Sequence, residues 1–207
     1  MRPRGEALQH PAADDLMQYA TTGCPVNCGQ QWTRDEIWAA IKNGACPSAQ
    51  DPKAAQCCRD EALQKVKEGH CRLIRWGDIK DNLPSNLKVS PIAAIPHKSR
   101  DYRMILNLAY KLRLNKAKLK SINESSNKNL APQHAMYELG NVIPRIIWSM
   151  ASAPENGIPI LFTKIDLKDG YWRMVVNEED AWNFAYVLPS LIVVADDDIE
   201  LVIPNAL

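Results

Sequence analysis

A single acidic side chain, Asp166, stands where a short apolar run ends. Residues 159–165 read Pro-Ile-Leu-Phe-Thr-Lys-Ile, which is typical of a buried strand, and Asp166 follows directly. A strand that ends in a carboxylate places it at the rim of a sheet, where ions and substrates gather. Gly170 allows close backbone approach to a ligand, and Tyr171 adds a flat ring. These residues alone also fit a structural role, in which Asp166 caps a turn.

Two basic residues occupy a predicted β-hairpin further upstream. Residues 88–98 are extended and apolar, residues 99–101 form a polar turn, and apolar residues then alternate from 102 to 108. This pattern predicts a hairpin with Lys98 and Arg103 near its tip. The two cations either hold phosphate groups or are simply solvated.

Both segments resemble motifs of retrotransposon-type reverse transcriptases. The likeness to the fingers hairpin rests on Ser90-Pro-Ile-Ala-Ala-Ile-Pro-His-Lys98 and Tyr102-Arg-Met-Ile-Leu-Asn107-Leu. The likeness to the first palm motif rests on Phe162-Thr-Lys-Ile-Asp166-Leu-Lys-Asp-Gly-Tyr171-Trp-Arg-Met-Val-Val176 and Asn183-Phe-Ala-Tyr186. The motifs occur in the family's order and cover roughly residues 83–188, about half of the chain. Asn107 departs from the acid that many relatives carry there.

The resemblance implies a two-metal nucleotidyl transfer in the full-length enzyme. Asp166, helped by the main-chain carbonyl of Leu167, would bind two magnesium ions that align a primer 3′-hydroxyl with a deoxynucleoside triphosphate. The partners implied are an RNA or DNA template-primer and deoxynucleoside triphosphates.

The resemblance also implies how the nucleotide is held. Lys98 and Arg103 would clamp the triphosphate from the fingers, with a point charge and a planar fork. The backbone of Asp169 and Gly170 would line the triphosphate pocket. Tyr171 would stack under the sugar and exclude a 2′-hydroxyl.

Charge is divided unevenly along the chain. Residues 98–128 hold nine basic and two acidic residues, a net charge of +7, and residues 154–200 hold three basic and ten acidic ones, a net charge of −7. A basic arm beside an acidic segment suits a protein that holds polyanions near cations, although two solvated loops also fit. The residues expected to contact nucleic acid are Lys111, Arg113, Lys116, Lys118 and Lys120.

The family completes its catalytic centre with a Tyr-x-Asp-Asp hairpin, which these 207 residues do not contain. The run Asp196-Asp197-Asp198 imitates it but lacks the Tyr and lies only thirty residues after Asp166, so we expect a surface β-turn. The chain is therefore expected to be a fragment, lacking downstream palm and thumb, that does not polymerise by itself. The alternatives are a non-catalytic nucleic-acid-binding module and a degenerate retroelement remnant.

Six cysteines lie in roughly the first third of the chain: Cys24, Cys28, Cys46, Cys57, Cys58 and Cys71. Their spacing matches no compact zinc-finger pattern, so reduced structural thiols are expected and zinc is not.

The expected fold is α+β, an incomplete right-hand polymerase. Residues 1–82 form a helical extension with helices at 33–43 and 51–69, residues 83–130 the fingers hairpin and basic connector, and residues 131–207 a partial palm. In the palm, strands at 159–165, 182–188, 191–195 and 199–203 form an antiparallel sheet, backed by a helix over 132–152 that kinks or breaks at Pro144. No apolar run reaches the roughly 20 residues of a membrane helix, and the N-terminus lacks a secretory signal, which predicts an intracellular protein of the nucleus or cytoplasm.

Overall fold

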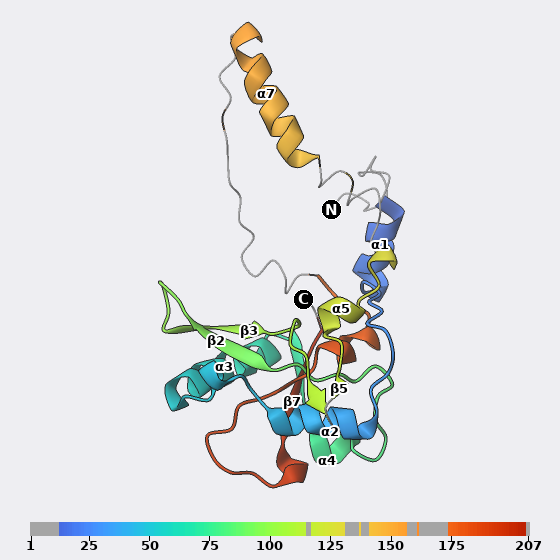
Figure 1. Cartoon of the computed structure of the whole chain (residues 1–207), viewed down its shortest axis with the longest axis vertical. Coiled ribbons are helices and arrows are strands. Elements are labelled where there is room, and N and C mark those ends of the chain that lie inside the picture. Colours follow the sequence, from blue (N-terminus) through green and yellow to red (C-terminus); the bar gives the residue numbers. More distant parts are fainter. Residues whose placement is uncertain are drawn as a thin grey trace.

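The computed structural model describes residues 13–114, 117–130, 137, 141–156, 161 and 174–205. The helices are α1 (Ala13–Thr22), α2 (Arg34–Asn43), η1 (Pro47–Ala49), α3 (Pro52–Lys67), α4 (Trp76–Ile79), α5 (Ile122–Ser125), η2 (Lys128–Leu130), α7 (Val142–Asn156), η4 (Asp180–Phe184) and η5 (Asp196–Asp198). The strands are β1 (Cys71–Arg75), β2 (Ile92–Pro96), β3 (Tyr102–Leu106), β4 (Arg113–Leu114), β5 (Ala117–Lys118), β6 (Tyr186–Val187) and β7 (Glu200–Pro204). The ladders are antiparallel, so the α+β prediction is confirmed (Figure 1).

Helices α2 and α3 begin where the sequence predicts. The Thr33 backbone N–H donates to Glu36 Oε2 over 2.7 Å and the Glu36 N–H donates to Thr33 Oγ1 over 3.3 Å, which together form a capping box. At α3, the Asp51 carboxylate accepts from two backbone N–H groups, and Pro52 occupies the first helical position.

The sheet joins residues 71–75 to the C-terminal part of the chain. Its strand order is β1-β7-β6, with Leu73 opposite Val202 on one side and Tyr186 opposite Val202 on the other. Strand β1 was not predicted, and it places part of the expected N-terminal helical segment beside strands of the expected palm. Backbone pairing over such a sequence separation depends on the partner strand, so local pattern does not reveal it.

Small side chains let α3 lie close to the strands. Ala54, Ala55, Cys58 and Ala62 of α3 are buried. Some of them share a core with Tyr186, Val202 and Ile92 of the sheet and the β2–β3 hairpin. A second core joins α2 to α4 and the C-terminal strands; it includes Ile37, Ile41, Trp76, Phe184 and Leu201.

Several predicted elements differ in the structure. Residues 180–184 form η4, so the strand expected at 182–188 is reduced to β6, because Ala181 and Phe184 reach the core from a helical turn. Residues 191–195 form no strand, and Ile192 and Val193 are exposed. The predicted basic connector contains β5 and α5, two elements that were not predicted, and α5 begins at a second capping box at Ser121.

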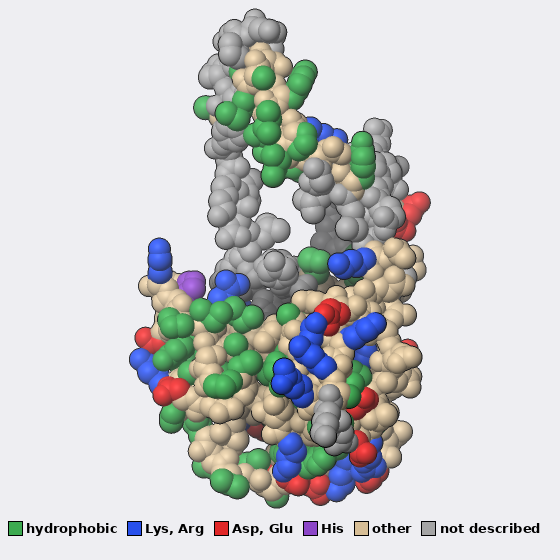
Figure 2. Space-filling view, in the orientation of Figure 1, with side chains coloured by type: hydrophobic (Ala, Val, Ile, Leu, Met, Phe, Trp, Pro, Cys, Tyr) green, Lys and Arg blue, Asp and Glu red, His purple; other side chains and the backbone are tan. Residues whose placement is uncertain are grey.

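The expectation that a helix over 132–152 backs the sheet is wrong. The helix in this region, α7, stands apart from the strands, and most of its large apolar side chains are exposed (Figures 1 and 2). Helix α3 packs against the sheet instead. Pro144 lies in the first turn of α7. Backbone N–H groups in the first turn of a helix make no intrahelical hydrogen bond, so a proline there costs none.

Within the described ranges, no helix is both long and apolar enough to span a bilayer.

Candidate nucleic-acid interface

The β2–β3 hairpin forms as predicted, with Ile92 opposite Leu106 and Pro96 opposite Tyr102. Side chains of β3 alternate between half-buried and exposed, because one face of the hairpin packs on α3. Lys98 lies in the tip and Arg103 lies one residue into β3, and both side chains are exposed. The hairpin therefore presents both predicted phosphate-binding cations to solvent.

The other charges of the tip are used to fix it to α3. Arg100 Nη1 lies 3.3 Å from Glu61 Oε2, and Lys53 Nζ lies 2.8 Å from Asp101 Oδ2. The Met104 backbone N–H also donates to Glu61 Oε2 over 3.4 Å. In the part of the chain that the structure describes, no carboxylate pairs with Lys98 or Arg103. These two cations remain able to accept an anion.

The basic arm folds as a second, shorter hairpin, β4–β5. Arg113 and Lys118 are directly opposed across its two strands. Lys111 forms an ion pair with Glu124 and is thereby partly neutralised. Among the described residues, Arg113, Lys118 and Lys120 have no acidic partner, and all three are exposed. Lys and Arg side chains gather over β5 and α5 on the face seen in Figure 2.

Beside this hairpin lies a hollow of about 520 Å³. Gln30, Gln31 and Trp32 form one side of it, and Lys118 and Lys120 form another. Trp32 lies outside the predicted motifs. The only sequence signal is an aromatic residue in a polar stretch, Gly29-Gln30-Gln31-Trp32, immediately before a helix cap.

The predicted catalytic and sugar-binding residues lie outside the described residues. These are Asp166, Leu167, Asp169, Gly170 and Tyr171, and the same holds for Lys116 of the arm. The described chain resumes at residue 174, where Val176 forms a parallel bridge with Cys24. The Cys24 N–H donates to the Val175 carbonyl over 2.8 Å, and the Asn177 N–H donates to the Cys24 carbonyl over 3.0 Å. The end of the Asp166 motif is thus bound to the N-terminal part of the chain.

The acidic run at 196–198 forms the 3₁₀ helix η5 rather than the expected β-turn. Asp196 Oδ1 lies 2.6 Å from Lys42 Nζ, and Asp197 Oδ2 lies 2.7 Å from Lys80 Nζ. Lysines on α2 and after α4 therefore neutralise two of the three carboxylates. Gly77 is needed at this contact, because a Cβ there would lie 2.9 Å from the Asp197 carbonyl oxygen. The two ion pairs thus hold η5 against α2 and the end of α4.

No group of three or more His, Cys, Asp or Glu side chains suited to a metal ion occurs among the described residues. All six cysteines are free thiols, and Cys28, Cys58 and Cys71 are buried. Burial raises the pKa of the Cys58 thiol to about 11 and that of the Cys71 thiol to about 12. High thiol pKa values oppose thiolate formation, so these cysteines act as small core residues.

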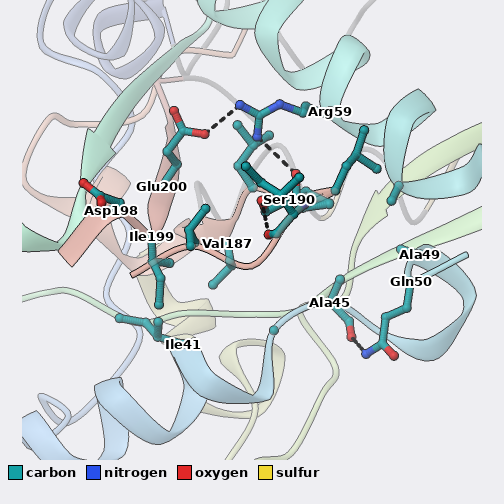
Figure 3. A pocket seen from close by; sticks show the side chains of 17 residues that line it. Ile41, Ala45, Ala49, Gln50, Arg59, Val187, Ser190, Asp198, Ile199 and Glu200 are labelled. Carbon is teal, nitrogen blue, oxygen red and sulfur yellow. Dashed lines mark hydrogen bonds and ion pairs between the residues drawn. The ribbon is translucent and has the colours of Figure 1, made fainter. Parts of the chain in front are cut away.

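A hollow of about 590 Å³ separates α3 from the loop before β7 (Figure 3). Its walls are largely apolar, from Ile41 and Ala49 on one side to Val187 and Ile199 on the other. Arg59 crosses it, donating to Glu200 Oε2 over 2.8 Å and to the Pro189 carbonyl over 3.1 Å. The charges of Arg59 and Glu200, which line this hollow, are thus paired with each other.

Lys88 is a buried cation that the sequence did not single out. Its amine donates to the Cys28 carbonyl, and desolvation by burial lowers its pKa. Its backbone N–H donates to the Trp182 carbonyl over 3.1 Å. Lys88 thus ties the loop before α2 to the segment around η4.

Comparisons with protein-family models, curated proteins and solved structures found no match to this chain.

Proposed function

We propose that the chain is the fingers and first part of the palm of an RNA-directed DNA polymerase of a retroelement. The observation that carries the proposal is the β2–β3 hairpin. It presents Lys98 and Arg103 to solvent without acidic partners in the described part of the chain, while Arg100 and Asp101 beside them are ion-paired. Both cations are thereby free to contact a phosphate group, and they lie in the hairpin that resembles the fingers of this family.

In this proposal the hairpin holds the triphosphate and the segment at 166–171 holds the reacting end of the nucleotide. Asp166 and the Leu167 carbonyl would hold magnesium, which supplies charge neutralisation at the transferred phosphate. Asp169 and Gly170 would contact the triphosphate through the backbone, and Tyr171 would contact the sugar. Arg103 provides two parallel N–H donors for one phosphate, and Lys98 provides a mobile point charge.

The hairpin's role can be tested by crosslinking a photoreactive deoxynucleoside triphosphate to the chain and mapping the modified peptide. We expect modification within residues 92–106. The double variant Lys98→Ala/Arg103→Ala should reduce the yield about tenfold or more, because a hydrogen bond to a charged group contributes about 1.5–3 kcal/mol. Arg103→Lys should lose part of the yield, since the charge remains and the fork is lost.

Arg100→Gln is the matched control, because Arg100 lies in the same tip but is paired with Glu61. It should leave the yield nearly unchanged. Equal losses for Arg100→Gln and the double variant, or modification outside the hairpin that a nucleoside competes away, would contradict the proposed triphosphate contact.

A second function, nucleic-acid binding without catalysis, is favoured by the β4–β5 hairpin. Arg113, Lys118 and Lys120 are exposed and unpaired within the described ranges, and such cations bind backbone phosphates irrespective of sequence. This activity can accompany the first function or occur without it. It predicts binding that weakens steeply as salt concentration rises.

The salt dependence provides the measurement. Changing Arg113, Lys118 and Lys120 together to Gln should lower the slope of log K against log salt by about 2 for single strands, because each phosphate contact contributes about 0.7. Lys53→Gln and Lys80→Gln should not change the slope, since both lysines are paired with aspartates. An unchanged slope in the triple variant would show that Arg113, Lys118 and Lys120 do not contact the nucleic acid.

A further inference from the structure

The hollow of about 520 Å³ beside β5 combines an aromatic ring and amides from one segment of the chain with cations from another. Its volume lies within the range of about 300–1,000 Å³ that is usual for small-ligand sites. The loop before α2 supplies the ring and the amides, β5 and the residues after it supply the cations, and α5 closes one side. The residues that matter for binding are Gln30, Gln31, Trp32, Lys118 and Lys120.

Lys111 neutralises Glu124, so the hollow with Lys111 has three cations against two carboxylates, a net formal charge of +1 that favours an anion. Glu36 is engaged with the Thr33 backbone N–H over 2.7 Å, as part of the α2 capping box. Glu124 pairs with Lys111 and accepts a hydrogen bond from the Ser121 N–H over 3.2 Å. Both hydrogen bonds lower the pKa of Glu124, and the one from Lys111 has the larger effect. Both wall carboxylates therefore have partners of their own, while Lys118 and Lys120 have none among the described residues.

The β4–β5 pairing adds a cost that an anion removes. Arg113 and Lys118 are directly opposite each other, and like charges in this position destabilise a strand pair. Each strand has only two residues, so little backbone pairing offsets the repulsion. A phosphate held by Lys118 would screen this repulsion at the edge of the hollow.

Trp32 adds an aromatic surface to the hollow, which a site for a simple anion would not require. The ring is half-buried and packs on the core around α2 with part of its surface, while another part lines the hollow. A ring held by core packing loses little freedom when a base stacks on it. The amides of Gln30 and Gln31 provide both donors and acceptors for a base edge.

We propose that this hollow binds one nucleotide of a single-stranded nucleic acid, with the base stacked on Trp32 and the adjoining phosphates on Lys118 and Lys120. The inference rests on the second proposed function, phosphate binding by the arm, and adds a specific contact to a base. It predicts a preference for single strands, because a base within a duplex is not free to enter the hollow.

The test compares two fluorescein-labelled oligomers of eight nucleotides, oligodeoxythymidine and its abasic counterpart, by fluorescence anisotropy with the full 207-residue chain. We expect the chain to bind the abasic oligomer about tenfold or more weakly, since one stacked base contributes about that much. Trp32→Leu should weaken binding of the thymidine oligomer by a similar factor and leave binding of the abasic oligomer unchanged. Trp32→Phe, which keeps a ring, should restore most of the affinity.

Lys118→Gln/Lys120→Gln should weaken binding of both oligomers, and Lys67→Gln, an exposed lysine on α3 outside the hollow, should weaken neither. Circular dichroism melting confirms that the Trp32 variants remain folded. Equal affinity of the unaltered chain for the two oligomers overturns the stacking contact even if every Trp32 variant unfolds. If only the lysine variant weakens binding, the arm binds phosphates and the hollow does not bind a base. If the chain binds neither oligomer, both proposals are wrong.

Discussion

Gly23→Ala should destabilise the folded chain by about 3 kcal/mol or more, the sum of left-handed backbone strain and overpacking. Gly23 has a φ of +80°, and a Cβ there would lie 2.5 Å from the Asn177 nitrogen and 2.6 Å from the Val176 oxygen. These are backbone atoms, so no side-chain rotation can relieve the contact. The bridge between Cys24 and Val176 would have to open. Urea unfolding followed by circular dichroism measures the loss.

Gly69→Ala is the matched control for this substitution. Gly69 has a φ of +77°, almost the same as that of Gly23, but nothing lies within 4 Å of its ideal Cβ position. It should cost only the backbone strain, about 1–2 kcal/mol. Equal losses at the two positions would show that the close approach of residues 23–24 to residues 176–177 is not present in solution.

The Gly23 contact bears on function through its position. Residues 174–177 follow directly on the segment that carries Asp166 and Tyr171, and their backbone is bound to Cys24. Opening this bridge releases one end of that segment. A loss of triphosphate crosslinking in Gly23→Ala at temperatures where the variant is still folded would link the N-terminal part of the chain to the proposed nucleotide site.

Raising the pH above 9 should destabilise the chain steeply under reducing conditions. The Cys58 and Cys71 thiols have an ordinary pKa of 9.0, which burial raises to about 11 and about 12 in the folded chain. Above pH 9 the unfolded chain loses these protons first, so their stabilising contribution, complete below pH 9, is lost as pH rises through 11 and 12. Each thiol lowers the free energy of unfolding by up to about 1.4 kcal/mol per pH unit in this window.

Urea unfolding at pH 8 and pH 10 measures this loss. The variants Cys58→Ala and Cys71→Ala should each show a smaller drop between the two pH values than the unaltered chain, although both start from lower stability because each removes buried volume. Cys57→Ala, a half-buried neighbour on α3, is the control and should keep most of the drop, because burial is the main cause of the raised pKa of Cys58. Burial also raises the pKa of the Tyr186 hydroxyl. Part of the drop should therefore remain when Cys58→Ala and Cys71→Ala are combined in one variant. Identical drops in all variants would contradict the burial of these thiols.

Local signals in the sequence predicted the elements whose stability is local. The capping box at Thr33, the Asp51-Pro52 start of α3 and the polar turn between β2 and β3 each involve residues a few positions apart. Hydrogen bonds and backbone preferences over such short distances are the same in most folds. The alternation that exposes Arg103 and half-buries Tyr102 and Met104 follows from strand geometry in the same way.

Apolar runs were less informative. The run at 191–195 has strand composition, but its residues pair with no strand among the described residues, and Val193 is fully exposed. The more polar Cys71–Arg75 became strand β1 because β7 offers it a complete ladder. Strand formation depends on pairing and packing as much as on composition, so the sequence alone misassigned both.

The sequence by itself predicted which residues could carry chemistry: the Asp166 motif, the Lys98 and Arg103 cations, and the uneven distribution of charge. Only the tertiary structure decided which of the charges are available to a ligand. It paired Arg100, Lys111, Asp196 and Asp197 with partners on other elements and left Lys98, Arg103, Lys118 and Lys120 without carboxylate partners in the described chain. It also brought Trp32 beside Lys118, across more than eighty residues of sequence. Ion pairing and cavity formation depend on distances between elements, and these arise only when the chain packs.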